Sequence, residues 1–286
     1  MPDKAPAWVV PVMRAGYFAR AAVYTVVGAL AVTAAIKGGA AQGTTDALAD
    51  LKSEPWGTPL LFAVGLGLFA YTLWRLVDAW MDLEDYGHDA KGILARAGLT
   101  ITGLIHAGIG VSVISLALGQ GGSGGGGTQS AVQRIMELPY GKWVVAGVGL
   151  VTIGAGIYYA YKGIAEKYKE HIRVTRTTRR LDPVLKFGCI AEGAVIGIIG
   201  ILIVFAGLTA NASEAGGLGQ ALGEIRQVAY GRILLAVVGL GLVAFAVENV
   251  IEGVYRVIPR RAGPDVMTMA RRAKLEAEGK LDEALA

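Results

Sequence analysis

Six stretches of the chain are apolar and long enough to cross a bilayer as helices, which takes about 20 predominantly apolar residues. They are residues 15–36, 58–81, 97–118, 143–165, 187–208 and 232–255. Each stretch is apolar on every face, whereas a helix on the surface of a soluble protein keeps one polar face. The pattern predicts an all-α polytopic membrane protein with six transmembrane helices. Because the number of spans is even, both termini are expected on the same side.

Residues at fixed spacing show that the spans form a three-fold internal repeat. The odd-numbered spans align as Gly16-x3-Arg20-x3-Tyr24-x3-Gly28, Gly98-x3-Thr102-x3-His106-x3-Gly110 and Gly188-x3-Glu192-x3-Ile196-x3-Gly200. The even-numbered spans align through Gly65, Gly149 and Gly239. Units of two spans keep one orientation, so the pattern predicts three parallel two-helix repeats around a pseudo-three-fold axis along the membrane normal.

The repeat also divides the chain into segments. The repeats cover residues 14–82, 97–166 and 187–258; between and beyond them lie an N-terminal segment (1–13), two connections (83–96 and a basic one, 167–186) and a C-terminal tail (259–286). Residues 266–285 of the tail show helical spacing and predict a helix at the cytoplasmic membrane surface. The acidic residues between 78 and 89 lack the ligand spacing of a calcium loop and are interpreted as a solvated turn.

The loop inside each repeat follows one plan. A glycine cluster leads into a short mixed segment in which apolar residues such as Ala47, Leu48 and Leu51 recur at helical spacing. We therefore predict a short helix lying in the membrane interface in each external loop. The aromatic residues Trp56, Tyr140 and Tyr230 occupy equivalent positions and suit the outer membrane surface.

Two motifs resemble a known family. GYFARAAVYTVVGALAVTAA in the first span and PWGTPLLFAVGLGLFAYTLWRLVDA around the second are similar to a bacterial integral membrane family catalogued as domain of unknown function twelve-zero-six. The resemblance covers residues 14–258 approximately and is strongest in the first repeat, because Arg20 is replaced by Thr102 and Glu192 in the other two. It implies three two-span units. It implies no activity.

The composition agrees with a membrane protein. Of 286 residues, 53% are hydrophobic, only 17% are charged and 42 are glycine, and the mean hydropathy is +0.50. Soluble domains carry about 25% charged residues. The single cysteine, Cys189, excludes an intrachain disulfide framework and a cysteine-clustered metal site.

The basic residues predict the orientation. Most of the 27 Lys and Arg residues lie on the side of the termini, with a dense run between 162 and 186. The positive-inside rule then places both termini in the cytoplasm of a bacterial inner (plasma) membrane. We expect the basic segments to contact anionic lipid headgroups rather than nucleic acid.

Charged and polar side chains inside the spans are the candidate functional residues, because a charge near the bilayer centre costs about 2.5–3.5 kcal/mol on insertion scales. By their depth they form one layer in the cytoplasmic third of the membrane: Arg20, Arg75, Asp78, Glu192, Glu248, Asn249 and Glu252. The favoured interpretation is an ion-pair cluster between repeats, for example Arg20 with Glu192 or Glu248. The alternatives are the gate or substrate site of a transporter, and side chains that reach back to the headgroups.

His106 is expected in the middle of the membrane. No other histidine lies in a span, since His88 and His171 are in the connections, so an interhelical hydrogen bond is favoured over ligation of a haem or metal, and no cofactor is predicted. No catalytic motif appears in a suitable context. The sequence predicts a non-enzymatic protein that organises or assists a membrane protein partner. A transporter or channel for a small solute or ion, gated by the polar layer, is the alternative.

Overall fold

A computed structural model describes residues 6–120, 126–259 and 266–278. All regular elements in these residues are helices, and two isolated β-bridges pair segments of the connections. The six long helices are α1 (Val9–Lys37), α3 (Gly57–Met81), α4 (Ala90–Ala117), α6 (Gly141–Ile164), α7 (Arg176–Thr209) and α9 (Gly231–Tyr255). The short ones are α2 (Thr44–Lys52), α5 (Gly126–Met136), α8 (Leu218–Gln227), α10 (Met269–Ala277) and the 3₁₀ turns η1 (Lys167–Glu170) and η2 (Ala212–Glu214).

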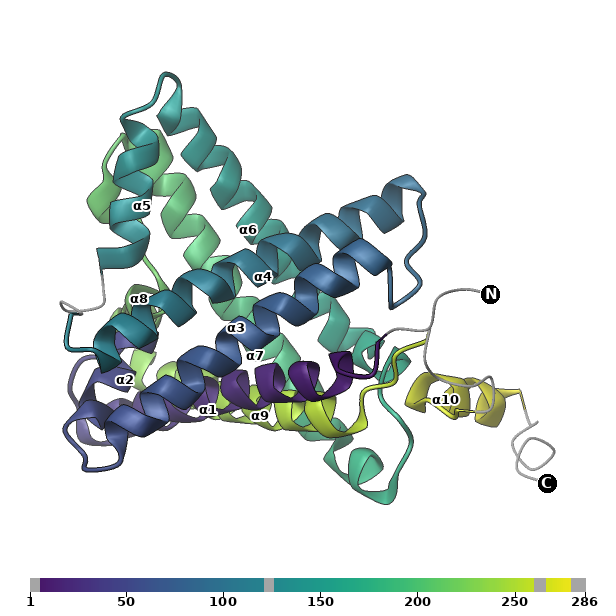
Figure 1. Cartoon of the computed structure of the whole chain (residues 1–286). Helices are drawn as coiled ribbons and strands as arrows, with labels where there is room; N and C mark the ends of the chain where they lie inside the picture. The colour runs from purple at the N-terminus through teal and green to yellow at the C-terminus, as the bar shows by residue number, and fades with distance from the viewer. Residues whose placement is uncertain (1–5, 121–125, 260–265, 279–286) are drawn as a thin grey trace.

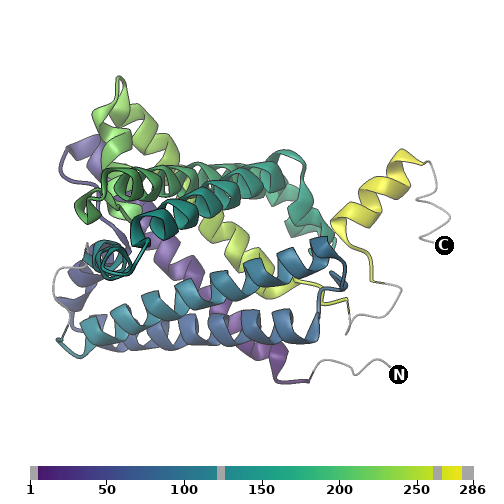
Figure 2. The same ribbon diagram turned by 90° about the horizontal axis from the view of Figure 1, so that it is seen from above.

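The six long helices are each long and apolar enough to cross a membrane, which confirms the predicted all-α architecture of six spans. The loop helices α2, α5 and α8 lie together at one end of the bundle, called here the loop end (Figure 1, left). The other end, where α1 begins and α9 ends, carries α10 and is called the terminal end. Figure 2 shows the same separation from a perpendicular direction.

Three of the long helices begin well before their predicted spans, and the other three begin within two residues of them. The early starts are at Val9, Ala90 and Arg176 rather than at residues 15, 97 and 187. Two of these starts are capped: the Asp89 side chain accepts a hydrogen bond from the Gly92 amide, and Thr175 forms a reciprocal capping box with Thr178. Such caps satisfy orphan amides of the first turn outside the apolar stretch. The second half of the predicted basic connection therefore forms the first turns of α7.

Glycine pairs join each repeat to the next and follow the three-fold pattern. The pairs are Gly28 with Gly239, Gly110 with Gly65, and Gly200 with Gly149. A Cβ built at Gly28 would lie 2.7 Å from the Gly239 oxygen, so a larger residue would separate the two backbones. Small residues let helices approach closely in lipid, where little hydrophobic force draws them together. The second span of each repeat thus packs against the first span of another.

Packing within the repeats is less symmetric. The spans of the first repeat contact each other, as do those of the third, whereas α4 and α6 of the second share almost no contact in the described chain. A Cβ at Gly16 would lie 2.5 Å from Tyr71 Cα and one at Gly188 2.5 Å from Phe245 N, yet one at the equivalent Gly98 would meet nothing within 4 Å.

The sequence explains why the second repeat stays open. Where the spans of the first repeat come closest, a Cβ at Gly67 would meet the side chain of Ala19, and in the third repeat one at Gly241 would meet that of Ala191. The corresponding residues of the second repeat are Val151 and Ile101. Two bulky β-branched side chains thus occupy the positions where glycine and alanine allow contact elsewhere.

The loop end is tightly closed. The glycines of the aromatic-Gly motifs, Gly57, Gly141 and Gly231, each lie against a backbone carbonyl of the preceding loop helix, where a Cβ would collide. Arg232 of α9 donates to the carbonyls of Ala35 (2.8 Å) and Ile36 (2.6 Å), which are left free at the end of α1.

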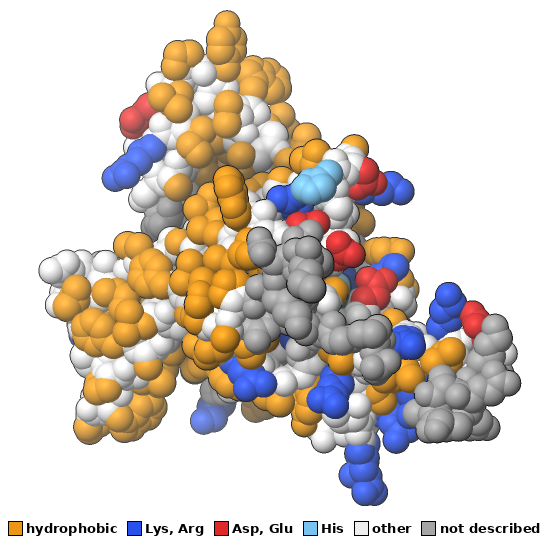
Figure 3. All heavy atoms as spheres, turned by 45° about the vertical axis from the view of Figure 1, so that its right-hand side comes forward, with side chains coloured by type: hydrophobic (Ala, Val, Ile, Leu, Met, Phe, Trp, Pro, Cys, Tyr) orange, Lys and Arg blue, Asp and Glu red, His pale blue; other side chains and the backbone are white. Residues whose placement is uncertain are grey.

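The terminal end is organised by backbone contacts between connections. Bridges pair Ile172 with Arg256 and Arg173 with Thr268, so the connection after α6 is held to the chain after α9. The predicted tail helix is present as α10, which Thr268 caps, and the part of the tail beyond residue 278 lies outside the described residues. Figure 3, with this end forward, shows charged side chains of both signs gathered there and hydrophobic side chains over the flanks of the bundle.

Candidate polar site at the terminal end

All seven residues of the predicted polar layer are buried in the structure. Six of them form two groups. The outer group lies at the terminal end and contains Arg75, Asp78, Glu248 and Glu252, while the inner group contains Arg20 and Glu192. Asn249 stands apart: its side-chain amide donates to the Phe245 carbonyl one turn earlier (2.8 Å).

Arg75 is the centre of the outer group in the first repeat. Its guanidinium donates to the hydroxyls of Tyr71 and Tyr17, each at 2.9 Å. It also forms ion pairs with Asp78 (3.4 Å) and Glu84 (3.8 Å). A buried guanidinium needs several acceptors, since its five donors cannot reach water. Here the acceptors come from α1, from α3 and from the connection that follows α3.

Glu84 corrects the interpretation of the acidic connection as a solvated turn. Its side chain is buried, with the residue 5% exposed, and so is Asp82, whose carboxylate accepts from the Tyr86 and Gly87 amides (2.8 and 3.0 Å). Glu84 pairs with Arg256 and accepts a hydrogen bond from the Tyr86 hydroxyl (2.8 Å). The turn therefore folds inward, around its own Tyr86 and Gly87 and toward Arg256 at the end of α9.

The charge balance around Glu84 decides its protonation. Burial alone would raise the pKa of the carboxyl, but Arg256, then His171 and Arg75, outweigh burial and hold the pKa below its usual range. Burial lowers the pKa of His171, whose ring nitrogen lies 3.9 Å from a Glu84 oxygen. Glu84 is therefore a carboxylate that faces the guanidinium groups of Arg256 and Arg75.

Ion pairs link this group to the other two repeats. Arg256 also pairs with Glu252 of α9. Lys162, at the end of α6, pairs with Glu248 (3.1 Å) and Glu252 (3.8 Å). The chain of contacts from Arg75 through Glu84, Arg256 and Glu252 to Lys162 joins all three repeats. Lys162 holds the same repeat position as Asp78 and Glu252 but has the opposite charge, and this difference in the sequence indicates an ion pair between repeats. No feature of the sequence indicates that Glu84 belongs to the site.

The inner group does not contain the expected ion pair. Within the described residues Arg20 lies within pairing distance of neither Glu192 nor Glu248; it donates instead to the Tyr71 hydroxyl (3.0 Å). Its guanidinium carbon lies 4.7 Å from the centre of the Tyr71 ring and 5.4 Å from that of Phe245, at cation–π distance. Glu192 accepts from the Tyr24 hydroxyl (2.5 Å). Arg20 Nε and Glu192 Oε2 are buried without a partner.

His106 packs beside this group but bonds within its own helix. Its Nδ1 lies 2.8 Å from the Thr102 carbonyl, and its ring centre lies 4.6 Å from that of Tyr71. The expected interhelical bond is thus replaced by an intrahelical one. A carbonyl oxygen only accepts, so Nδ1 carries the proton. In the described part of the chain, no three His, Cys, Asp or Glu side chains are grouped closely enough to hold a metal ion.

Comparison with known proteins now identifies the family. The pattern of a family described as Domain of Unknown Function (DUF1206) matches three segments of the chain, residues 15–82, 97–166 and 187–256. The chain belongs to this family. The matched segments coincide with the three predicted repeats.

A curated relative supports the bacterial assignment of the DUF1206 family. The chain is 27% identical over 253 residues to a protein of Bacillus subtilis (strain 168) described as "Uncharacterized protein YxxB", an alignment that covers 87% of this chain and 92% of the relative. No solved structure matches the chain.

The boundaries of the DUF1206 segments also show how the polar site is composed. Arg75, Glu252 and Arg256 lie inside matched segments, whereas Glu84 and His171 lie in the connections between them. The outer group is therefore built from the repeats and completed by their connections.

Proposed function

We propose that this protein is a non-enzymatic component of the bacterial inner membrane, with both termini in the cytoplasm, that organises a partner complex by holding a partner's transmembrane helix against its second repeat. The orientation is supported by the basic residues around the terminal end. The partner site is supported by one observation: the spans α4 and α6 do not pack on each other, although the equivalent spans of the other repeats do.

The open face between these helices, called here the seam, is formed by Gly98, Ile101 and Ile105 of α4 and Val148, Val151 and Ala155 of α6. Positions of the seam that are buried in the other repeats are exposed here. Ile101 is 49% exposed, whereas its equivalents Ala19 and Ala191 are 7% and 6% exposed. Ile105 is 57% exposed, whereas Val23 and Val195 are 6% and 1% exposed. In the closed repeats, what covers these positions is a helix.

Glycines on the same two helices favour a helix as the occupant over lipid alone. Five glycines in the six long helices have no neighbour within 4 Å of a built Cβ: Gly98, Gly108, Gly147, Gly154 and Gly197. Four of the five lie on α4 and α6. Exposed glycine permits close approach of a second backbone, which flexible acyl chains do not need.

Photocrosslinking in native membranes tests the proposal. A photoreactive amino acid at Ile105 or Val151 is expected to give a covalent product with a second protein, while the same residue at Ile233 or Leu240, exposed on α9, gives none. A product of twice the mass of the chain identifies a second copy as the occupant and overturns the partner assignment. Lipid adducts alone at all four sites overturn the seam as a docking site.

Transport is a second candidate function, favoured by the inner group. Arg20 Nε and Glu192 Oε2 are unpartnered polar atoms inside the bundle, where a buried polar group normally finds a partner. Proteoliposomes containing a pH-sensitive or cation-sensitive dye test it. A flux through the native protein that is lost in a folded Glu192→Gln variant supports a channel or transporter, and no flux above that of empty vesicles removes this candidate.

A further inference from the structure

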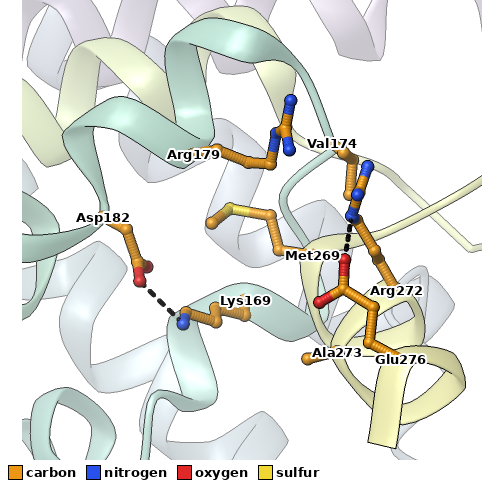
Figure 4. A pocket seen from close by; sticks show the side chains of 8 residues that line it. All are labelled: Lys169, Val174, Arg179, Asp182, Met269, Arg272, Ala273 and Glu276. Atoms are coloured by element: carbon orange, nitrogen blue, oxygen red, sulfur yellow. Dashed lines mark hydrogen bonds and ion pairs between the residues drawn. The ribbon is translucent and has the colours of Figure 1, made fainter.

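A cavity of about 260 Å³ lies at the terminal end, apart from the polar site and the seam. Figure 4 shows the side chains that line it, which come from the turn η1, the segment between η1 and α7, the start of α7 and the helix α10. Val174 and Met269 form its apolar wall, and Lys169, Arg179 and Arg272 bring three positive charges to it.

The three cations differ in how they are paired. Lys169 pairs with Asp182 (2.8 Å) and Glu166 (2.6 Å), and Arg272 pairs with Glu276 (2.7 Å) along α10. Within the described chain, the side chain of the exposed Arg179 lines the cavity and forms no hydrogen bond or ion pair. Its backbone amide donates to the Thr175 carbonyl (3.2 Å). The lining therefore carries one unneutralised guanidinium between two ion pairs, drawn as dashed lines in Figure 4.

The two ion pairs leave donors available to a ligand. The Arg272–Glu276 pair joins a half-buried arginine to an exposed glutamate four residues on along one helix, and pairs of this spacing contribute little to stability. Partial burial would lower the pKa of Lys169, but its hydrogen bonds to Asp182 and Glu166 raise it, so the amine stays a cation. An oxyanion that replaces one carboxylate would find two or three charged donors.

The cavity lies at the level expected for lipid headgroups. It precedes the predicted span 187–208, and η1 follows directly on the end of α6, where Tyr158, Tyr161 and Ile164 are exposed. Exposed tyrosines at the end of a spanning helix are typical of the membrane–water interface. Arg176 and Arg180 are also exposed in the first turns of α7, close to Arg179, and add positive potential at the same level.

We propose that this cavity binds the phosphate of an anionic lipid headgroup, held by Arg179 with help from Lys169 and Arg272. Guanidinium groups match the geometry of phosphate oxygens and bind them bidentately. Because α10 supplies one wall, a bound lipid would fasten the C-terminal helix to the membrane face of the bundle.

Native mass spectrometry of the full-length protein in detergent tests the site. Short-chain phosphatidylglycerol and phosphatidylcholine are added separately, and inorganic phosphate is the third probe. We expect phosphatidylglycerol to bind to the native protein in preference to phosphatidylcholine. Arg179→Gln should weaken this binding about tenfold, as expected for the loss of a charged hydrogen-bond donor. Arg176→Gln is the matched control, since Arg176 is an exposed arginine of the same turn that does not line the cavity.

The outcomes are distinct. Equal binding of the two lipids, or equal loss in Arg179→Gln and Arg176→Gln, overturns the site. Binding of inorganic phosphate that depends on Arg179, with no competition from phosphatidylglycerol, overturns the lipid as its source. Retention of the native melting temperature in both variants shows that the comparison is between folded proteins.

Discussion

At the scale of single residues, buried charges at the terminal end are held by reciprocal pairing. Glu84 and Glu252 both pair with Arg256, and all three side chains are almost completely inaccessible. A buried ion pair adds little to stability compared with an apolar replacement, but removal of one member leaves the other as an uncompensated buried charge. Arg256 has two such partners, one in the connection after the first repeat and one in the third repeat. It is therefore the residue on which this end of the bundle depends most.

Arg256→Gln is expected to destabilise the protein by about 3–5 kcal/mol, because it removes the closest cation from the buried carboxylates of Glu84 and Glu252. The remaining cations, Arg75 and Lys162, each lie 3.8 Å from one of these carboxylates. Arg256→Lys should recover part of the loss, since an ammonium can pair with one carboxylate but not span both. Thermal unfolding in detergent measures the effect, with Arg173→Gln, an exposed arginine of the neighbouring connection, as control. A melting temperature of Arg256→Gln equal to that of the control would contradict the role of Arg256.

His171 should make stability depend on pH. Burial lowers the pKa of this imidazole, and its effect exceeds the opposing attraction of Glu84. The unfolded chain therefore takes up a proton more readily than the folded one. The stabilisation is fully present above the usual pKa of about 6.5 and is lost as the pH falls through the lower folded pKa.

We expect the free energy of unfolding to fall as the pH drops below about 6.5, and His171→Gln to flatten this dependence. Chemical unfolding in detergent at a series of pH values measures it. His88→Gln, in the exposed part of the other connection, should keep the native slope. The same slope in all three proteins would show that His171 does not titrate with folding.

At the scale of the elements, one repeat position has different consequences in different repeats. Gly16, Gly98 and Gly188 are equivalent in sequence, but only the first and third lie against a partner helix. The repeat provides internal controls because each substitution can be made at three equivalent sites.

Gly16→Val should therefore destabilise the protein by at least about 1–3 kcal/mol, the usual cost of overpacking, since its Cβ would collide with the backbone at Tyr71. Gly98→Val should be tolerated, because nothing lies within 4 Å. The yield of folded protein and its melting temperature in detergent measure both. If Gly98→Val is as damaging as Gly16→Val, α4 has a partner helix that the structure does not contain.

The sequence was sufficient for the spans and the repeat, because both depend on local composition and spacing. It was insufficient for Glu84 and Arg256, which meet across 172 positions of the chain and lie in or beside connections without a periodic pattern. The hydrogen bond of His106 to a carbonyl of its own helix could not be predicted from the sequence either, since it depends on whether a neighbouring helix offers the ring a partner. The open second repeat could have been foreseen: Ile101 and Val151 stand where the other repeats have alanine and glycine.

At the scale of the whole molecule, the spans pack together within two of the three repeats and stay apart in the second, along the seam. Replacing the bulky side chains of the seam with small ones should let α4 and α6 pack together. In the double variant Ile101→Ala, Val151→Gly, the second repeat acquires the residues that bring the spans together in the other two. We expect α4 and α6 to approach the interaxial separation of about 8–10 Å typical of packed helices. Spin labels at Ile105 and Val148 in a Cys189→Ser background would measure this by pulsed electron resonance as a shorter distance. The same variant should lose the crosslinked partner of the native protein. An unchanged label distance would show that the side chains at these positions do not keep the repeat open.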